Sequence, residues 1–429
     1  MIDGKRIADR VLQLAKGADV SISLAESRTG STRFAVNQLT SSSDVERTDL
    51  SVTVQYGQRA ATAVTNQLDD RALADVVARA QRMARLAPEN PELMPSLGAQ
   101  RYLAVPHAED PATVALGPAV RAKAAATAIA AGGTGVTIAG FYTHATIATT
   151  IATSHGLYGQ HRYTACSLAC TARTADATGS GWAGTASNRA ADLDAAALAK
   201  VAVDKATRSA KPRKLDPGRY TVILEPAAAG ELLGFLTGSL DARPADEGRS
   251  FFAKKPPGDK LFPATISVRT LPQDPALTTV PFDDEGLPRE SIAWIDKGVV
   301  THLRHDRFWG KKQGKPAVAA PAGWQLDGGT ESREALIKGV KRGVLVTRFW
   351  YTNLVDPTTL LATGLTRDGT FLIEDGQITH PVNNFRFNES PVQMLARCDG
   401  LSTGVLVDGE RIPALRTNEF NLASISEAV

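Results

Sequence analysis

The residues best suited to chemistry in this sequence lie together in the segment His302-Leu303-Arg304-His305-Asp306. Imidazole and carboxylate groups are side chains that often hold zinc in proteins. In a β-strand, however, residues three apart face opposite sides, so His302 and His305 would share a metal only if the strand bends. The spacing therefore favours a pair of surface or cleft histidines over a metal site. The other histidines are dispersed without ligand spacing: His107, His144, His155, His161 and His380.

Nucleophilic catalysis and phosphate binding have less support in the sequence. Ser239 and Ser250 are candidate nucleophiles by location only, because the Gly-x-Ser-x-Gly elbow is absent. The stretch Gly132-Gly133-Thr134-Gly135 follows a predicted helix and precedes predicted strands, whereas a dinucleotide site needs a strand, a glycine turn and then a helix. The sequence thus predicts no catalytic residue on this chain.

Two segments are unusually rich in aromatic and amide side chains, at residues 348–353 and 383–388. Amide and arginine side chains can fix the backbone of an extended peptide that is bound by strand addition. An equally good interpretation places the aromatics in the core and the amides in turns. On the first interpretation, the predicted peptide-binding residues are Arg348, Tyr351, Asn353, Asn384 and Arg386.

The first half of the chain mixes strands with long helices. Residues 19–65 read as strands, and Leu50, Val52 and Val54 show the two-residue period of a half-buried strand. Asp69 is a plausible cap for a helix that carries apolar residues at helical spacing. Other helices are expected at the N-terminus and near residues 117–131 and 192–208. Residues 134–174 read as a strand meander with turns near Gly140 and Gly156.

The second half is dominated by predicted strands. Proline, glycine and charged residues mark residues 211–218 as the best domain boundary, which predicts domains at 1–210 and 215–429. A helix is expected over about 332–342, with Gly343 at its end, and long loops over 241–263 and 309–329. Regular βαβ alternation is missing, so the predicted fold class is α+β.

Four segments, in this order along the chain, resemble the TldD/PmbA (TldD/TldE) family of peptide-processing proteins. They cover residues 56–66, the helix-opening stretch Leu232-Leu233-Gly234-Phe235-Leu236-Thr237-Gly238-Ser239, the turn at 282–288 and the Leu-Ile-Glu-Asp-Gly-Gln-Ile element at 372–378. The resemblance spans nearly the whole chain. It implies an N-terminal α/β domain and a strand-rich C-terminal domain.

The family resemblance also identifies a degenerate metal motif. In the metal-bearing TldD branch, the central helix carries His-Glu-x-x-x-His. The matching positions here are Gly234, Phe235 and Ser239, and the cysteine ligand of that branch falls on or near Val405. Cys398 lies too early to replace it. A catalytic zinc normally needs three protein ligands, so the sequence predicts no metal or other cofactor on this chain and zinc on a TldD-like partner.

The resemblance implies a PmbA/TldE-like subunit of a heteromeric metalloprotease. Such a subunit completes the chamber of a TldD-like paralogue and binds unfolded peptide, but is not catalytic by itself. One alternative is a stand-alone homodimeric scaffold that binds peptides. Another is an enzyme repurposed for the biosynthesis of a peptide natural product.

Composition narrows the possible partners and location. The formal net charge of +3 over 429 residues gives no support for nucleic-acid binding, which requires concentrated Lys and Arg. Three cysteines do not form a disulfide framework, so a reducing compartment is expected. The N-terminus lacks an apolar signal region and no stretch is long enough to cross a membrane. The expected location is the cytoplasm, without membrane contact.

Overall fold

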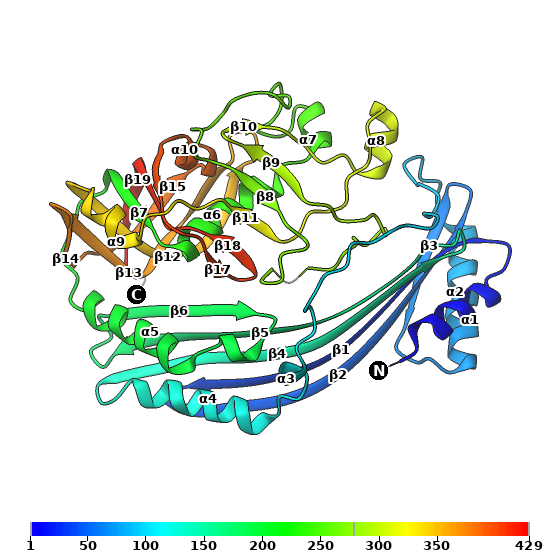
Figure 1. Ribbon diagram of the computed structural model, residues 1–429, viewed down its shortest axis with the longest axis horizontal. Helices are drawn as coiled ribbons and strands as arrows, with labels where there is room; N and C mark the ends of the chain where they lie inside the picture. Colours follow the sequence, from blue (N-terminus) through cyan, green and yellow to red (C-terminus); the bar gives the residue numbers. More distant parts are fainter. Residues whose placement is uncertain (1, 278, 428–429) are drawn as a thin grey trace.

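The computed structural model describes residues 2–277 and 279–427. An antiparallel sheet of long strands forms the base of the N-terminal part, in the order β3-β2-β1-β4-β5-β6 (Figure 1). The predicted alternation is confirmed, because Leu50, Val52 and Val54 are buried in β2. The strands are β1 (Asp19–Ala35), β2 (Gln38–Tyr56), β3 (Arg59–Thr65), β4 (Val136–Thr153), β5 (Tyr158–Thr174) and β6 (Ser180–Ser187).

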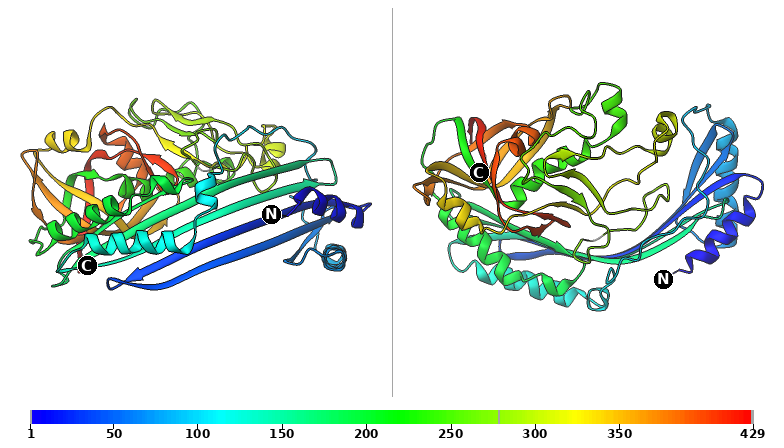
Figure 2. Two further views of the ribbon diagram at one scale, coloured as in Figure 1. Left: turned by 60° about the horizontal axis from the view of Figure 1, so that its bottom comes forward. Right: turned by 45° about the horizontal axis from the view of Figure 1, so that its top comes forward.

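Helices cover the two ends of this sheet separately. Figure 2 shows α1 (Gly4–Leu14) and α2 (Asp70–Leu86) at one end, and α4 (Pro118–Ala131) and α5 (Ala195–Ser209) at the other. Asp69 caps α2 as predicted, because its carboxylate accepts bonds from the backbone NH groups of Arg71 and Ala72. Two short helices complete this part: α3 (Pro111–Val114) and the 3-10 turn η1 (Ala190–Asp192).

The sheet has a different kind of core at each end. Under α1 and α2 the buried residues are mostly Leu, Val and Ile, whereas under α4 and α5 they are mostly alanine. The alanines let α5 approach the sheet closely. A Cβ added at Gly181 in β6 would collide with the carbonyl oxygen of Ala202. The glycine is therefore required by packing at this point.

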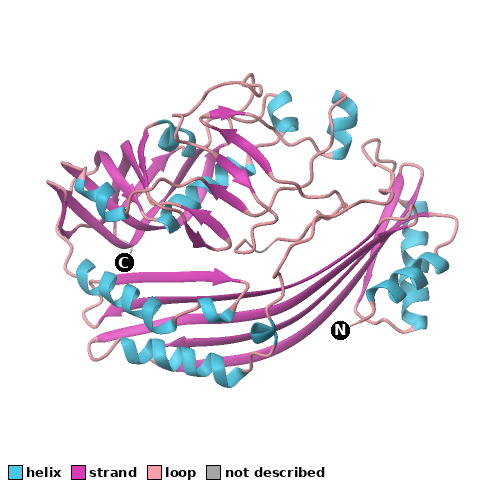
Figure 3. Cartoon of the chain, viewed as in Figure 1, coloured by secondary structure: helices cyan, strands magenta, loops and turns pink. Residues whose placement is uncertain are grey.

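The C-terminal part consists mainly of strands and loops (Figure 3). One sheet has the order β12-β7-β19-β15-β13-β14, and β12 also pairs with β13, so this sheet closes on itself. β16 pairs with β19 at its edge. The strands are β7 (Gly218–Leu224), β12 (Arg342–Asp356), β13 (Leu361–Glu374), β14 (Gln377–Pro381), β15 (Asn384–Glu389), β16 (Cys398–Leu401) and β19 (Leu415–Ser426).

A second C-terminal sheet has the order β10-β9-β8-β11-β18-β17. Its strands are short: β8 (Val268–Thr270), β9 (Ile292–Asp296), β10 (Val299–Val300), β11 (Trp324–Leu326), β17 (Val405–Val407) and β18 (Glu410–Ile412). The helices of this part are α6 (Pro226–Gly238), α7 (Ala242–Asp246), α8 (Arg307–Gln313), α9 (Arg333–Lys338) and α10 (Pro391–Ala396). Within the described residues, no helix is both long and apolar enough to span a bilayer.

The α+β prediction is confirmed, but several local predictions are wrong. β4 runs straight through Gly140, where a Cβ would collide with Phe34, so this glycine serves packing rather than a turn. The turn at Gly156 is confirmed by its positive φ of 89°. The predicted helix 332–342 is shorter, since α9 ends at Lys338 and Gly343 lies in β12. The predicted loops contain α7, part of α8, and β11.

Candidate functional site

Helix α6 and its C-cap carry the three positions that the sequence analysis predicts to match the metal motif of the TldD branch. It follows β7 directly, with Glu225 at its N-cap and Pro226 in its first turn. Leu232, Leu233 and Leu236 are fully buried in the C-terminal core. Burial of each such side chain stabilises the fold by about 1.5–3 kcal/mol. The helix is therefore fixed by its apolar face, and its remaining surface is free to form a site.

The exposed surface of α6 has no group that can bind a metal at the three motif positions. Gly234 is exposed, and a Cβ added there would meet no heavy atom within 4 Å. Phe235 packs against the C-terminal core. Ser239 caps the helix, and its hydroxyl donates to the carbonyl oxygen of Leu236 at 2.7 Å. These positions leave open space beside the helix rather than a ligand set.

The fourth position, Val405, lies in β17, and the β17–β18 hairpin packs beside α6. Val405 is 48% exposed and offers no thiolate. Cys398 is a buried free thiol in β16, and burial raises its pKa to about 11. Across residues 2–277 and 279–427, no group of three or more His, Cys, Asp or Glu side chains could hold a metal ion. The donor set does not fit a catalytic zinc, and the metal-free state stays a prediction.

The same hairpin carries a carboxyl group that sequence reasoning missed. Glu410 follows the Asp408-Gly409 turn and is half-buried. Burial raises the pKa of Glu410 to about 7, and the neighbouring Asp408 carboxylate adds to the effect. A perturbed carboxyl occurs at many functional sites and also in ordinary structure. No motif could have revealed it, because the burial arises from packing.

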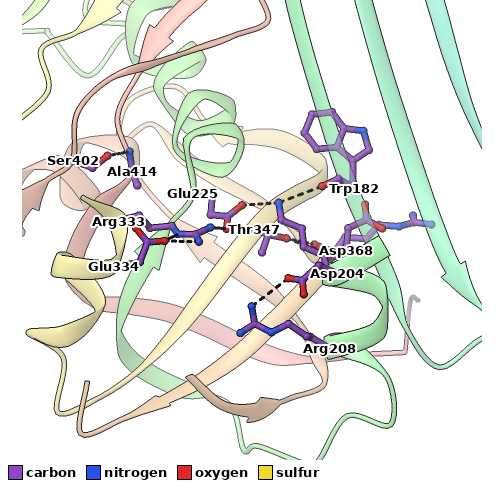
Figure 4. Close-up of polar contacts among 12 residues, drawn as sticks. Trp182, Asp204, Arg208, Glu225, Arg333, Glu334, Thr347, Asp368, Ser402 and Ala414 are labelled. Carbon is purple, nitrogen blue, oxygen red and sulfur yellow. Dashed lines mark hydrogen bonds and ion pairs between the residues drawn. The ribbon is translucent and has the colours of Figure 1, made fainter. Parts of the chain in front are cut away.

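A buried ionic cluster holds the N-terminal end of α6 (Figure 4). The Glu225 carboxylate accepts from Lys205 Nζ at 2.6 Å and from Arg333 Nη1 at 2.5 Å. Lys205 comes from α5 and also donates to the carbonyl oxygen of Trp182 in β6. Arg333 begins α9 and also pairs with Glu334. The cluster joins the N-terminal part, α6 and α9 at one point, and sequence reasoning did not find it.

His302 and His305 lie outside any strand and line the same cavity, which has a volume of about 860 Å³. The sequence-based argument assumed a strand, in which residues three apart diverge. That assumption is wrong, because the chain from residue 301 to 303 and at residue 305 is irregular. The expectation of a cleft histidine pair is consistent with this geometry.

The predicted peptide-binding residues do not form one cluster. Arg348 binds Asp368 at 3.2 Å, and its guanidinium lies 4.4 Å from the centre of the Trp182 ring, so it joins the two parts of the chain. Asn384 accepts from the hydroxyls of Thr366 and Thr370 at 3.2 and 2.9 Å. Both side chains are held by structural contacts.

The other predicted peptide-binding residues lie at the surface. Tyr351 is 74% exposed and has a positive φ of 56°, which is uncommon for a bulky residue. Asn353 donates from its side-chain amide to the Tyr351 carbonyl oxygen at 2.8 Å. Arg386 is exposed, and its closest hydrogen bond is a 3.4 Å contact to Thr363. Peptide binding by these residues stays a prediction.

Family models cover almost all of the chain. The models of the PmbA/TldA metallopeptidase match in succession: domain 1 at residues 20–84, the central domain at 107–210 and the C-terminal domain at 217–424. The chain belongs to the PmbA/TldD family. The resemblance inferred from four sequence segments is therefore confirmed.

Solved structures of similar proteins show the same fold throughout. A putative modulator of a DNA gyrase from Thermotoga maritima has a TM-score of 0.88 at 20% identity and covers 98% of this chain and 100% of its own. A putative modulator of DNA gyrase from Bacteroides thetaiotaomicron has 0.89 at 21%, covering 99% and 100%. TldE from Thermococcus kodakarensis has 0.89 at 16%, covering 98% and 99%. No curated protein matches the chain significantly.

Proposed function

We propose that this chain is a metal-free, PmbA/TldE-like subunit of a cytoplasmic peptide-processing metalloprotease. A TldD-like partner would supply the zinc and the catalytic glutamate, and this chain would complete the chamber and bind unfolded peptide. The proposal rests on the surface of α6, where the exposed Gly234 and the half-buried Phe235 stand at the positions predicted to match the metal-branch His and Glu.

The side chains on α6 determine what this subunit contributes. Water activation in a metallopeptidase needs a metal ion and a carboxylate that accepts a proton. Phe235 accepts no proton, and Ser239 donates its hydroxyl back to the helix. Gly234 adds no bulk to the space beside the helix. The chain therefore contributes a wall and room for a peptide, while the bond-breaking chemistry belongs to the partner.

The direct test compares the chain alone, a His-Glu-x-x-x-His paralogue from the same organism alone, and their mixture. Chelator-sensitive cleavage of an unfolded peptide is expected only when the paralogue is present, with the highest rate in the mixture. Light scattering should show a heteromer in the mixture. Robust chelator-sensitive cleavage by the chain alone would disprove the assignment, and a homodimer that ignores the paralogue would favour a stand-alone scaffold.

A reconstruction of the motif checks the role of the missing ligands. The triple variant Gly234→His, Phe235→Glu, Ser239→His should remain inactive, because Val405 supplies no thiolate and the hydrogen bonds that orient metal ligands are missing. Elemental analysis should find no stoichiometric zinc on the wild-type chain. One tightly held zinc per wild-type chain would contradict the proposed division of labour.

A further inference from the structure

A cavity with no assigned role opens just beyond the C-terminal end of α6. Its volume of about 860 Å³ lies in the range of small-ligand sites. Its walls come from α7, from residues 252–257, from residues 301–305 and from residues 313–318. In Figure 1, α7 and α8 stand near this region, on the side of the C-terminal part away from the long N-terminal sheet.

The charged side chains of the cavity are mostly cationic. Lys254, Lys255 and Lys315 line it, and Asp246 is the single carboxylate among its lining residues in the described chain. Asp246 already accepts a hydrogen bond from Trp309 Nε1 at 2.7 Å. Lys255 donates to a backbone carbonyl, but Lys254 and Lys315 have no ion pair within the described residues. Two ammonium groups are therefore available to an anion.

The two histidines of the cavity are oriented by the backbone. Nδ1 of His302 lies 2.9 Å from the carbonyl oxygen of Ala293, and Nδ1 of His305 lies 3.2 Å from that of Leu303. A carbonyl oxygen only accepts hydrogen bonds, so each Nδ1 carries the proton. Nε2 of each ring is left as the atom that can contact a ligand, since no hydrogen bond to it is found in residues 2–277 and 279–427.

Apolar residues form the rest of the wall. Phe252 and Leu303 belong to the C-terminal core and are almost completely buried, and Ala242 and Ala245 of α7 lie beside them. Cationic groups around an apolar wall suit a ligand that has an anionic end and an apolar body. Specificity in such pockets comes from a few polar groups placed on a mainly apolar wall.

The cavity is tied to the end of α6 by backbone hydrogen bonds. Arg304 NH donates to the carbonyl oxygen of Leu240 at 2.9 Å, and Ala242 NH donates to the carbonyl oxygen of Arg304 at 2.8 Å. The segment that carries His302 and His305 is thus paired with the chain that leaves α6. A peptide with one end bound in this cavity would therefore lie next to α6, the helix predicted to match the catalytic helix of the metal branch.

We propose that this cavity binds the terminal carboxylate of an extended peptide, with an apolar side chain of the last residue against Phe252 and Leu303. Lys254 and Lys315 would pair with the carboxylate, and Nε2 of each histidine would accept a hydrogen bond from a backbone NH group of the peptide. The peptide as ligand rests on the proposed function. A metal is disfavoured as the occupant because the lysines repel cations and a third ligand is missing among the described residues.

Fluorescence anisotropy of the full chain tests this site. The probes are a fluorescein-labelled, leucine-rich hexapeptide with a free C-terminal carboxylate and the same peptide as its C-terminal amide. The free acid should bind about tenfold more tightly, because charge-assisted hydrogen bonds to the carboxylate are lost in the amide. The double variant Lys254→Gln, Lys315→Gln should remove this preference. Lys341→Gln, on an exposed lysine that does not line the cavity, is the matched control and should keep this preference.

The outcomes separate this site from the proposed function. Peptide binding without a preference for the carboxylate, or a preference that survives the double variant with its fold intact by circular dichroism, would overturn the site and leave the peptide-binding subunit standing. Stoichiometric zinc binding that is lost in His302→Gln, His305→Gln would overturn it in favour of a metal. Failure of the chain to bind either peptide, alone or with the paralogue, would overturn both proposals.

Discussion

Arg121 and Glu225 are both charged side chains that are almost removed from solvent, but they join different parts of the chain. Arg121, from α4, is 0% exposed and reaches Asp44 in β2, so its ion pair lies within the N-terminal part. Glu225, at 8% exposure, joins Lys205 of α5 to Arg333 of α9. The first cluster fastens a helix to its own sheet, and the second fastens the two parts to the start of α6.

The two clusters also differ in which of their charged side chains is exposed to water. Asp44 is 44% exposed, so water can solvate it, whereas Arg121 has no access to water. In the second cluster the acid is buried and Arg333 is 39% exposed. Breaking a buried pair costs most when the charge left behind is the buried one. Substitutions at the acid positions should therefore have unequal effects.

The largest effect is expected for Asp44→Ala, which leaves the buried Arg121 guanidinium without its carboxylate. The free energy of unfolding should fall by about 3–5 kcal/mol, measured by urea denaturation at neutral pH. Asp49→Ala is the matched control on the same strand, because its partner Arg47 is 72% exposed. That control should cost less than about 1 kcal/mol. Equal losses would show that Arg121 is solvated in solution.

Glu225→Gln should lower the free energy of unfolding by about 2–3 kcal/mol, because it leaves Lys205 and Arg333 facing an uncharged amide. Limited proteolysis within residues 210–217, between α5 and β7, should become faster as the two parts separate more often. Glu334→Gln is the control, since Glu334 pairs with the same arginine but is 63% exposed. If both variants behave alike, the cluster does not couple the parts.

The two clusters also mark the limit of sequence reasoning on the fold. Alternation in β2 and the cap at Asp69 follow from neighbouring residues and were predictable. Closure of the C-terminal sheet depends on β12 pairing with β7 and β13, which local patterns do not specify. The predicted turn at Gly140 was wrong because the sequence does not distinguish a glycine that makes room for Phe34 from a glycine that makes a turn. Tertiary packing decided these cases.

The candidate site was predictable only through the family resemblance. The resemblance predicted the degenerate motif positions on α6 and at Val405, and the β17–β18 hairpin that carries Val405 does pack beside that helix. The contacts of Glu225 and the shared cavity of His302 and His305 depend on segments far apart in sequence or on irregular backbone. From residue types alone, the two histidines could be assigned no function, and the charged side chains around Glu225 that hold the start of α6 could not be identified.

The Arg121 cluster should also make stability depend on pH, because Nδ1 of His144 in β4 lies 3.4 Å from Nη1 of Arg121. Burial lowers the pKa of His144, and the charge of Arg121 lowers it further. The unfolded chain then binds the proton more tightly than the folded one, so stability should fall as the pH drops below the ordinary histidine value of about 6.5. His144→Gln, which keeps a hydrogen-bond acceptor, should flatten this dependence between about pH 7 and pH 5. An unchanged slope in thermal denaturation would rule His144 out as its source.

Glu410 sharpens the comparison, because it is a half-buried carboxyl that has no ion pair within the described residues. Its pKa is raised to about 7 by burial, so the folded chain holds the proton more tightly than the unfolded one. The stability supplied by the protonated form is present below the ordinary value of about 4.3 and is lost as the pH rises through about 7. Glu410→Gln should therefore raise the free energy of unfolding at about pH 8 by about 1 kcal/mol, which for a chain of 429 residues raises the melting temperature by about 1 °C, and change it little at about pH 4. The control Glu334→Gln removes an exposed, paired carboxylate and should give no such gain. A gain of equal size at both pH values would mean that the amide improves packing. It would contradict the prediction that ionisation of Glu410 destabilises the hairpin beside α6.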